Sequence, residues 1–265
     1  ESRSRAAELS FEAERCLACG ACVAACPQQA RHIDPEGRHS LDRSACCVCG
    51  DCVDRCPAQV TKLVGNLKTV ETVLAEVLKD RPFYEQSGGG LTVSGGEPTL
   101  QFGFLCDLLA AARAEGLHCA VESCLVCPPE RLEHLVPLVD CWLCDWKETD
   151  PALHRQWTGA DNERIRANLA LLDRRGAAIH LRCPLVPGYN DRDEHFAGIA
   201  ALSRELVNCR SVELMPYHRL GESKITRFGL DPARHLAIES PDEETVADWY
   251  ARLRAHGVRN LVAET

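Results

Sequence analysis

The sequence has no apolar run that approaches the length needed to span a bilayer, and its first residues do not form the pattern of a secretory signal peptide. Basic residues are in the minority, because 30 Lys and Arg stand against 39 Asp and Glu, which gives a formal net charge of −9. No basic stripe runs along the chain. We therefore expect neither a membrane nor a nucleic acid among its partners.

Cysteine, in contrast, is abundant, with 17 residues. An odd number of cysteines, bunched at gaps of two and three residues, does not fit the disulfide framework of a small secreted domain. Thiolates that bind a metal in a reducing compartment explain the bunching better, and we expect a cytoplasmic protein. At 265 residues, the chain has room for one large α/β domain and a small module.

Eight of the cysteines form two runs with the same spacing, Cys-x2-Cys-x2-Cys-x3-Cys-Pro. This spacing is typical of bacterial two-cluster ferredoxins, in which three cysteines wrap one [4Fe–4S] cube and the fourth reaches the other cube. The predicted ligand sets are site A (Cys16, Cys19, Cys22 and Cys56) and site B (Cys46, Cys49, Cys52 and Cys26). Zinc is the competing interpretation, but zinc takes four ligands and rarely uses eight in this arrangement.

Gly20 and Gly50 each follow the second cysteine of a run, and we expect them to relieve crowding where backbone amides point at sulfur. Cys47 falls outside the repeat and is expected to pack rather than to bind metal. The remaining cysteines favour buried thiols. Four of them could also imitate a zinc ribbon, although residues three apart in a strand point to opposite faces. These four are Cys124, Cys127, Cys141 and Cys144, and the others are Cys106, Cys119, Cys183 and Cys209.

From residue 68 onward, strand and helix signals alternate. Strands are predicted at about 90–94, 117–122, 139–145, 178–186 and 211–215, with a short last one at 258–263. Helices are predicted at about 70–81, 99–115, 129–137, 162–175, 192–206 and 241–256, with Thr69 and Thr99 as caps and Pro82 as a stop. This alternation predicts a parallel sheet, curled or closed as a barrel, with helices outside.

Polar side chains gather where the predicted strands end, which is the edge at which such folds place their chemistry. Any one of them could be an ordinary surface residue, but five consecutive strands each contribute one. Carboxylates and cationic groups occur together, which suits a zwitterionic ligand with an amine and a carboxylate. The polar residues are Glu97, Glu122, Ser123, Asp145, Lys147, Arg182 and His218, and two glycines, Gly95 and Gly96, precede Glu97. We expect Glu97 and His218 to face one pocket.

With these motifs, the sequence resembles the radical S-adenosylmethionine (SAM) enzymes. More narrowly, it resembles the glycyl-radical-enzyme activating enzymes that carry a two-cluster ferredoxin insert. Besides the cysteine repeat, the resemblance rests on segments 94–98 (SGGEP), 145–147 (DWK), 157–159 (WTG), 184–191 (PLVPGYND) and 215–221 (MPYHRLG). It implies an α/β fold, a partial parallel (β/α)6-type radical SAM barrel whose first strand is missing. The implied divisions are a remnant at 1–12, a ferredoxin-like domain at 13–66 and the partial barrel at 67–265.

The resemblance also implies roles for single residues. Gly95, Gly96 and Glu97 would hold the methionine amino group of SAM. The methionine and adenosyl parts would contact Asp145, Lys147 and His218. Glu122 and Ser123 would help to bind a monovalent cation beside the methionine carboxylate, together with the main chain near Met215, and Arg182 would face the same pocket. Lys147, His218 and Arg182 are the residues expected to serve catalysis.

The implied reaction is the reductive cleavage of SAM to methionine and a 5′-deoxyadenosyl radical, which takes a hydrogen atom from a backbone glycine of a partner glycyl radical enzyme. The implied electron donor is of the flavodoxin or ferredoxin type. The family binds a third [4Fe–4S] cluster through Cys-x3-Cys-x2-Cys, a pattern that the printed residues, which begin with Glu1, do not contain. We expect the printed residues alone not to cleave SAM. The alternatives are an electron-transfer protein on a non-catalytic barrel and a radical SAM enzyme with another substrate.

Overall fold

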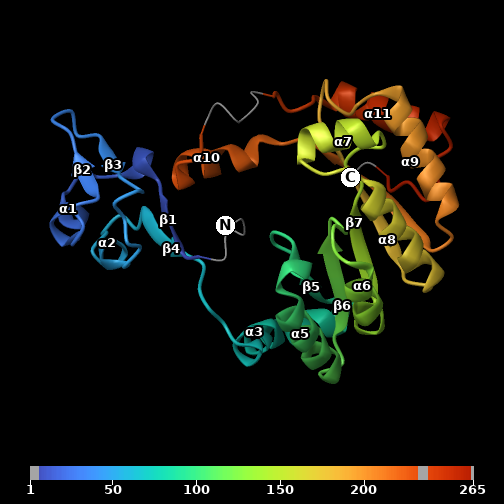
Figure 1. Ribbon diagram of the computed structural model, residues 1–265, viewed down its shortest axis with the longest axis horizontal. Coiled ribbons are helices and arrows are strands. Elements are labelled where there is room, and N and C mark those ends of the chain that lie inside the picture. The colour runs from blue at the N-terminus through green and yellow to red at the C-terminus, as the bar shows by residue number, and fades with distance from the viewer. Residues whose placement is uncertain (1–5, 232–237, 264–265) are drawn as a thin grey trace. The chain divides into compact units, whose positions relative to one another are not determined.

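The computed structural model (Figure 1) describes residues 6–231 and 238–263, which fall into two compact units. Of the described residues, the first unit holds 6–67 and 219–231, and the second holds 68–218 and 238–263. Within these ranges, no helix has both the length and the apolar character needed to cross a membrane.

The first unit contains two small antiparallel sheets, whose strands repeat with the same spacing as the cysteine runs. One sheet pairs β1 (Glu8–Phe11) with β4 (Thr61–Val64), and the other pairs β2 (Arg31–Ile33) with β3 (His39–Leu41). The helical segments are η1 (Ala13–Arg15), α1 (Ala21–Ala25) and α2 (Asp51–Asp54). Leu9 lies opposite Leu63 in one sheet, and His39 lies opposite Ile33 in the other. A shift of thirty positions carries Leu9 to His39 and Ile33 to Leu63, so the strand pairing repeats with the same period as the cysteines.

Gly20 and Gly50 precede α1 and α2 with φ angles of 75° and 92°, in the left-handed region. A Cβ at either position would meet no atom within 4 Å, so the expectation that these glycines relieve crowding is wrong. Glycine is required there because the backbone is left-handed. Other positive φ angles recur in both repeats, at Ala18, Gln29, Val48 and Gln59.

A segment from far along the chain completes the first unit. It comprises η5 (Arg219–Gly221) and α10 (Glu222–Phe228), and α10 packs on β1. Arg43 donates to the carbonyl oxygens of Leu9 at 2.7 Å and of Arg227 at 2.6 Å. The unit buries few apolar side chains, and the cluster of buried residues that this unit forms is small, with Leu9, Cys22 and Cys52 as members.

The second unit is built on a five-stranded sheet whose strands are all parallel and lie in sequence order, which confirms the predicted α/β class. The strands are β5 (Gly90–Val93), β6 (His118–Ser123), β7 (Cys141–Asp145), β8 (Ile179–Leu185) and β9 (Cys209–Pro216). The main helices are α3 (Val70–Val77), α4 (Arg81–Ser87), α5 (Phe102–Ala114), α6 (Pro129–Leu135), α7 (Pro151–Thr158), α8 (Glu163–Arg174), α9 (Asp193–Glu205) and α11 (Glu243–Ala255).

The helices α5, α6, α8, α9 and α11 each bury apolar side chains in the core around this sheet, as the period of their apolar residues requires. In Figure 1, α5 lies beside β5 and β6. The helix α8 contacts α6, and α11 contacts α9. Fully buried side chains come from each layer, among them Leu109, Trp142, Leu172, Phe196 and Trp249. At the start of β5, a Cβ on Gly90 would lie 2.1 Å from the carbonyl oxygen of His118, so only glycine allows this strand to pair so closely.

Two helix boundaries differ from the sequence-based expectations. Thr69 caps α3 as predicted, accepting from the N–H of Thr72, but helical structure does not stop before Pro82. A 3-10 turn, η2 (Leu78–Asp80), leads into α4, and Pro82 lies in the first turn of α4, where a missing N–H costs nothing. The side chain that caps the 3-10 turn η3 (Pro98–Gln101) is that of Glu97 rather than Thr99.

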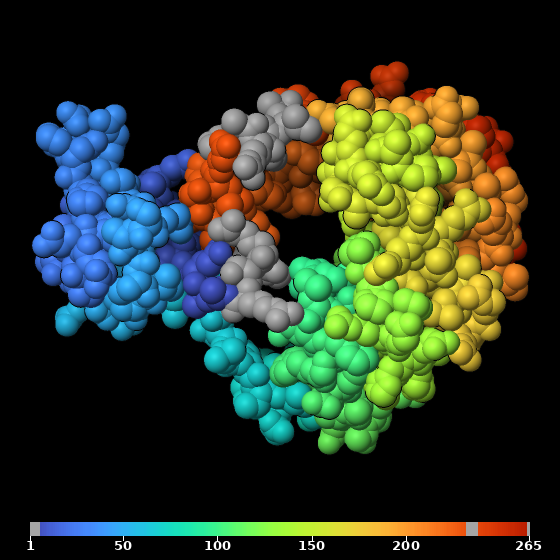
Figure 2. Space-filling model, in the orientation of Figure 1, coloured from blue at the N-terminus to red at the C-terminus, as the bar shows by residue number. Residues whose placement is uncertain are grey.

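Toward the end of the chain, the predicted strand at 258–263 is wrong, because only a single bridge forms there, between Leu261 and Val212. The short helix α7 was not predicted, although Asp150 caps it by accepting from the N–H groups of Ala152 and Leu153. Most of its residues are exposed, and Figure 2 shows α7 at the surface of the second unit.

Candidate functional site

A pocket opens at the carboxyl ends of β5, β6 and β7, with about 670 Å³ of space, part of it open to solvent. Its lining residues are Gly95, Gly96, Glu97, Glu122, Ser123, Cys124, Asp145 and Lys147. The structure thus brings together every residue of the predicted SAM-binding set except His218.

The loop after β5 depends on its two glycines. Gly95 and Gly96 have φ angles of 84° and 64°, and two successive left-handed residues are disfavoured for any side chain with a Cβ. The loop therefore presents main-chain groups to the pocket rather than side chains. Glu97 then returns to extended backbone with φ −118°.

The carboxylate of Glu97 is held by groups of the chain itself. Its Oε1 accepts from the N–H and hydroxyl of Thr99 at 3.1 and 2.6 Å and from the hydroxyl of Ser123 at 2.9 Å. Its Oε2 accepts from the N–H of Cys124 at 2.9 Å. Burial acts to raise the pKa of Glu97, but the hydrogen bonds from Thr99 and Cys124 outweigh it and lower the pKa below the usual 4.5. Glu97 thus ties the loop after β5 to the end of β6.

Cys124 is a lining residue that the sequence analysis did not foresee, because it was weighed only as a thiol or zinc ligand. Burial, assisted by the neighbouring carboxylate of Glu97, raises the pKa of its thiol to about 11. Cys124 is therefore protonated at neutral pH, and it contributes its backbone N–H to the site. The other cysteines of the sheet, Cys119, Cys127, Cys144, Cys183 and Cys209, are buried, and Cys106 and Cys141 are half-buried.

At the end of β7, Nζ of Lys147 lies 2.8 Å from Oδ2 of Asp145. The loop that carries Lys147 is anchored by Asn190, which is 4% exposed. The side-chain amide of Asn190 donates to the carbonyl oxygens of Lys147 and Pro184, both at 2.7 Å, and its Oδ1 accepts from the N–H of Val186 at 2.7 Å. Asn190 lies in the 184–191 motif, which was the available signal, but its role needed the structure.

Behind this loop lies a buried carboxylate, Glu148, which is fully shielded from solvent. Its Oε1 accepts from the N–H groups of Thr149 and Asp150 and from Arg192, at 2.8 to 2.9 Å. His195 accepts from the N–H of Thr149 at 3.1 Å. Burial lowers the pKa of His195 to about 4, although Glu148 acts in the opposite direction. The imidazole is therefore neutral at physiological pH and supports the loop without charge.

Two of the predicted site residues do not line the pocket. Arg182, on β8, forms ion pairs with Glu122 at 2.6 Å and with Glu213 at 3.4 Å, so its side chain reaches the lining through Glu122. His218 is exposed and follows β9, at the opposite edge of the sheet from β5. The structure does not bring His218 into the pocket that Glu97 lines.

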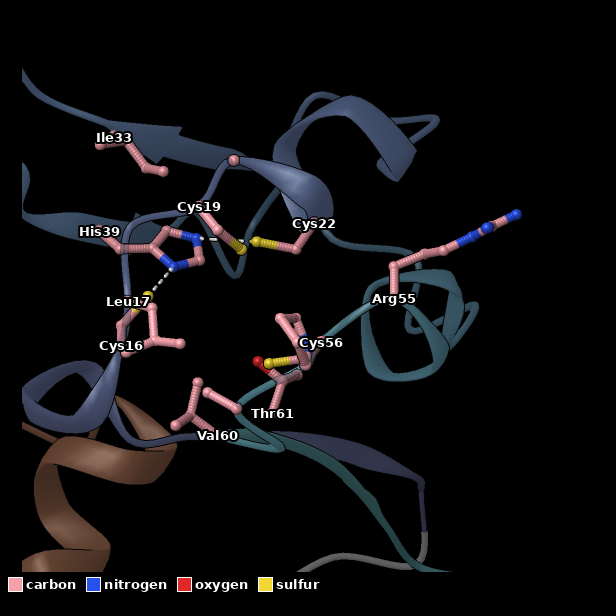
Figure 3. A pocket seen from close by; sticks show the side chains of 13 residues that line it. Cys16, Leu17, Cys19, Cys22, Ile33, His39, Arg55, Cys56, Val60 and Thr61 are labelled. Atoms are coloured by element: carbon pink, nitrogen blue, oxygen red, sulfur yellow. Dashed lines mark hydrogen bonds between the residues drawn. The ribbon is translucent and has the colours of Figure 1, made fainter.

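In the first unit, the four cysteines of site A line one cavity (Figure 3), with about 340 Å³ of space that is partly open to solvent. Cys56 joins them from the second run, as the ferredoxin spacing predicts. Among the described residues, no three His, Cys, Asp or Glu side chains converge as ligands of a single metal ion. A ring of thiols around a cavity is instead the arrangement that a cube with four corners requires, so the residues fit an iron–sulfur cluster.

Backbone N–H groups point at the first cysteine of each run in the same way. Ala18 donates to Sγ of Cys16 at 3.4 Å, and Val48 donates to Sγ of Cys46 at 3.4 Å. Cys46 thus has the same place in the second run that Cys16 has in the first. Cys47, next to Cys46, is exposed, so the expectation that it packs is wrong.

His39 is an additional feature of site A. Its Nδ1 lies 3.2 Å from Sγ of Cys16, and its Nε2 lies 3.6 Å from Sγ of Cys22. Burial lowers the pKa of His39, and the nearby cation of Arg31 lowers it further. Sequence reasoning missed both His39 and Arg31, because neither belongs to the cysteine pattern.

Comparisons with known proteins agree with this geometry. Residues 56–199 match the Radical SAM superfamily, and residues 15–60 match the 4Fe-4S dicluster domain. The chain is 39% identical over 230 residues to the isethionate sulfite-lyase activating enzyme of Nitratidesulfovibrio vulgaris, which covers 84% of this chain and 74% of that protein. It is 35% identical over 233 residues to the (2S)-3-sulfopropanediol dehydratase activating enzyme of Klebsiella oxytoca, which covers 84% and 73%. The chain belongs to the glycyl-radical-enzyme activating enzymes of the radical SAM superfamily.

A solved structure shares the fold of this activating enzyme. The domain of pyruvate-formate lyase-activating enzyme from Bacteroides vulgatus superposes with a TM-score of 0.54 at 24% identity, covering 66% of this chain and 99% of that one. The resemblance noted in the sequence is therefore confirmed. The activating enzyme is a radical SAM oxidoreductase, and its cofactors are iron–sulfur clusters and SAM.

Proposed function

We propose that this activating enzyme binds SAM in the pocket at the carboxyl ends of β5, β6 and β7 and installs a radical on a backbone glycine of a partner enzyme. When bound, SAM and the third [4Fe–4S] cluster of the family, in its reduced state, would supply a one-electron cleavage whose products are methionine and a 5′-deoxyadenosyl radical. The glycine then gives up one hydrogen atom, so that 5′-deoxyadenosine and a glycyl radical are formed.

The observation that carries the proposal is the charge pattern of the pocket. Three carboxylates, those of Glu97, Glu122 and Asp145, share the lining with the ammonium of Lys147. SAM carries two positive groups, the amine and the sulfonium, and one negative group, the carboxylate. A lining that is rich in carboxylates and also carries an ammonium offers a group of opposite sign for each charge of the ligand.

Two residues, Glu97 and Asn190, use hydrogen bonds to hold the loops of the pocket in position. Glu97 holds the Gly95–Gly96 turn against the end of β6, so that its main chain is in place before SAM arrives. Asn190 does the same for the loop of Lys147. Such preorganisation removes the cost of ordering the loops during binding.

For the cysteine-rich unit, we propose that site A and site B each hold a [4Fe–4S] cluster that passes electrons from a flavodoxin or ferredoxin-type donor toward SAM cleavage. The partner is proposed as a class. Relatives at 35–39% identity are named as activating enzymes for isethionate sulfite-lyase, (2S)-3-sulfopropanediol dehydratase and trans-4-hydroxy-L-proline dehydratase.

The test combines SAM binding with radical formation in the protein as its gene encodes it. Lys147→Met is expected to raise the Kd for SAM at least tenfold, about 1.4 kcal/mol, and to abolish the glycyl radical signal in electron paramagnetic resonance of a co-expressed partner. The matched control is Lys79→Met, because Lys79 is exposed and pairs with Glu76 on a helix surface. Unchanged SAM affinity in Lys147→Met would contradict the proposed binding site.

A further inference from the structure

Arg31 is a buried cation that has no acidic partner among the described residues. It is 1% exposed, at the start of β2. Its Nη2 donates to Sγ of Cys52 at 3.3 Å and to Oγ1 of Thr61 at 3.2 Å. Its Nε and Nη1 have no hydrogen-bond partner among the described residues. The face of Phe11, 4.8 Å from the guanidinium carbon, is its other neighbour.

An unpaired charge in this position is costly. Taking a guanidinium out of water costs several kcal/mol unless an opposite charge lies close by. No carboxylate accepts from Arg31 in the part of the chain that the structure describes, whereas Cys52 belongs to site B. A cube with four thiolate ligands is negatively charged, so a cluster at site B would supply the missing counter-charge.

The cation occurs in only one half of the repeat. Thirty positions separate Cys16 from Cys46, and the same shift carries Arg31 to Thr61. Both residues begin strands that take equivalent places in the two sheets, β2 and β4. The second half thus has a neutral hydroxyl where the first half has a permanent positive charge.

We propose that Arg31 raises the reduction potential of site B above that of site A, so that the two sites accept an electron at different potentials. The inference rests on the proposed assignment of the eight cysteines. Reduction adds one negative charge to a cluster, and a nearby cation and N–H···S bonds stabilise that charge. Arginine stays protonated in proteins, so the effect does not depend on pH.

Site A also lies within reach of the charge, because Thr61, which accepts from Nη2 of Arg31 at 3.2 Å, lines the site A cavity. The direct hydrogen bond to a cysteine, however, goes to Cys52 of site B. Phe11 lies between Arg31 and His39, with the centroids of the Phe11 and His39 rings 4.6 Å apart, and His39 contacts Cys16 of site A. Among the residues that the structure describes, Arg31 forms no hydrogen bond to a cysteine of site A. Removal of the charge should therefore lower both potentials, and that of site B by more.

The experiment is a redox titration followed by electron paramagnetic resonance on wild type, Arg31→Gln and Arg31→Lys. Cys19→Ser and Cys49→Ser assign the signals, because each perturbs one site. In Arg31→Gln, we expect the equilibrium constant for reduction to fall at both sites, and the factor of the fall to be at least ten times larger at site B than at site A. For a one-electron couple, this means that the potential of site B falls by about 59 mV more than that of site A. Arg31→Lys keeps the charge and is expected to keep most of the difference.

Arg55→Gln is the matched control, because it removes the same charge beside Cys56. Arg55 is exposed, and Figure 3 shows its side chain pointing away from the cavity, so solvent screens its charge. Its effect on either potential is expected to be much smaller. Equal shifts of both sites in Arg31→Gln, at full iron content, would overturn the role of Arg31. Wild-type protein without two [4Fe–4S] signals in this unit would overturn the cysteine assignment instead.

A measurement on the wild type keeps the proposal testable if the variants do not take up iron. Protein labelled with nitrogen-15 in arginine is reduced and examined by pulsed paramagnetic resonance. A nitrogen coupling on the site B signal that exceeds the one on site A supports the proposal. Equal couplings, or a stronger one on site A, would overturn it.

Discussion

The cysteine-rich unit and the five-stranded unit bury very different amounts of apolar side chain. The core of the second unit is continuous and includes side chains from the sheet and from α5, α8, α9 and α11. Among the described residues, the first unit buries only a few apolar side chains, and two of them are proposed cluster ligands. They are Leu9, Phe11, Cys22, Ala30, Cys52, Val60 and Phe228. We infer that the first unit depends for its order on what its cysteines bind, whereas the second unit does not.

Removal of iron should therefore produce the largest difference in stability between the two units. We expect the amides of β1 to β4 to lose nearly all protection from hydrogen exchange in the iron-free protein, because metal binding at such sites supplies folding free energy. The amides of β5 to β9 should stay protected. Tryptophan emission gives a second readout, because Trp142, Trp146, Trp157 and Trp249 all lie in the second unit.

Two neighbouring cysteines provide the control for this prediction. Cys49→Ser removes a proposed ligand of site B and should lower both iron content and protection, while Cys47→Ser should change neither, since Cys47 is exposed and outside the repeat. Full protection of β1 to β4 in iron-free protein would contradict the inferred dependence.

The next largest effect is expected from Glu97→Ala, and only in the second unit. The substitution leaves donors of Thr99, Ser123 and Cys124 without their acceptor, and unsatisfied buried donors cost about 1–3 kcal/mol each. We expect the free energy of unfolding to fall by about 2–4 kcal/mol, measured by urea denaturation through tryptophan emission, with iron content unchanged. Glu115→Ala is the control, because Glu115 forms an exposed ion pair with Arg81. Equal losses in both variants would contradict the role given to Glu97.

The lowered pKa of Glu97 also predicts how the free energy of unfolding changes with pH. Because the pKa of Glu97 is lower in the folded protein than its usual 4.5, its stabilising effect is complete above that value and is lost as the pH falls through the folded pKa. The difference in unfolding free energy between wild type and Glu97→Gln should thus be constant near neutral pH and narrow below about pH 4.5. Iron-free protein is suitable for this measurement. A gap that widens on acidification would show that the pKa is raised instead.

A smaller effect is expected from Asn190→Ala, which frees the loop of Lys147. We expect the Kd for SAM to rise about tenfold, or about 1.4 kcal/mol, because the position of Lys147 is no longer fixed by the 2.7 Å bond to its carbonyl oxygen. Titration calorimetry measures the change. Asp191→Ala is the neighbouring control, since Asp191 accepts from the N–H of Gly188 at an exposed turn. If the two variants bind SAM equally well, Asn190 does not position Lys147.

The smallest effect is expected within the first unit, at Gly229. Its φ of 60° is left-handed, and an added Cβ would lie 2.5 Å from Nε of Arg43. Gly229→Ala should weaken the attachment of α10 by about 1 kcal/mol, seen as faster hydrogen exchange in α10. Gly221→Ala should have little effect, because Gly221 has a φ of −75° and a Cβ there meets nothing within 4 Å. Similar hydrogen exchange in both variants would show that the close packing of Gly229 on Arg43 does not hold α10 in place.

The sequence predicted the parallel sheet well because its strands are apolar runs between glycines and amphipathic helices, and both patterns are local. The pocket followed from the rule that the carboxyl ends of parallel strands share one edge. Boundaries were less certain. Pro82 was interpreted as a stop, although proline is equally suited to the first turn of a new helix, which is where it lies.

What the sequence could not show depends on contacts between distant residues. The acceptor role of Glu97 toward Ser123 and Cys124 needs the end of β6 beside the loop after β5. Arg31 is an unremarkable basic residue in the sequence, and its burial arises only when the strand pairs of the first unit close around it. His218 belongs to a motif, but the motif does not show that β9, which it follows, lies at the opposite edge of the sheet from β5.

The strand pairing of the first unit carries a consequence for how such a unit arises. The first half of the repeat contributes β1 and β2, and the second half contributes β3 and β4, yet β1 pairs with β4 and β2 pairs with β3. Neither half pairs its own two strands. A peptide with a single copy of the repeat would thus have to associate with another copy to form any sheet, so the tandem chain is equivalent to a homodimer joined end to end.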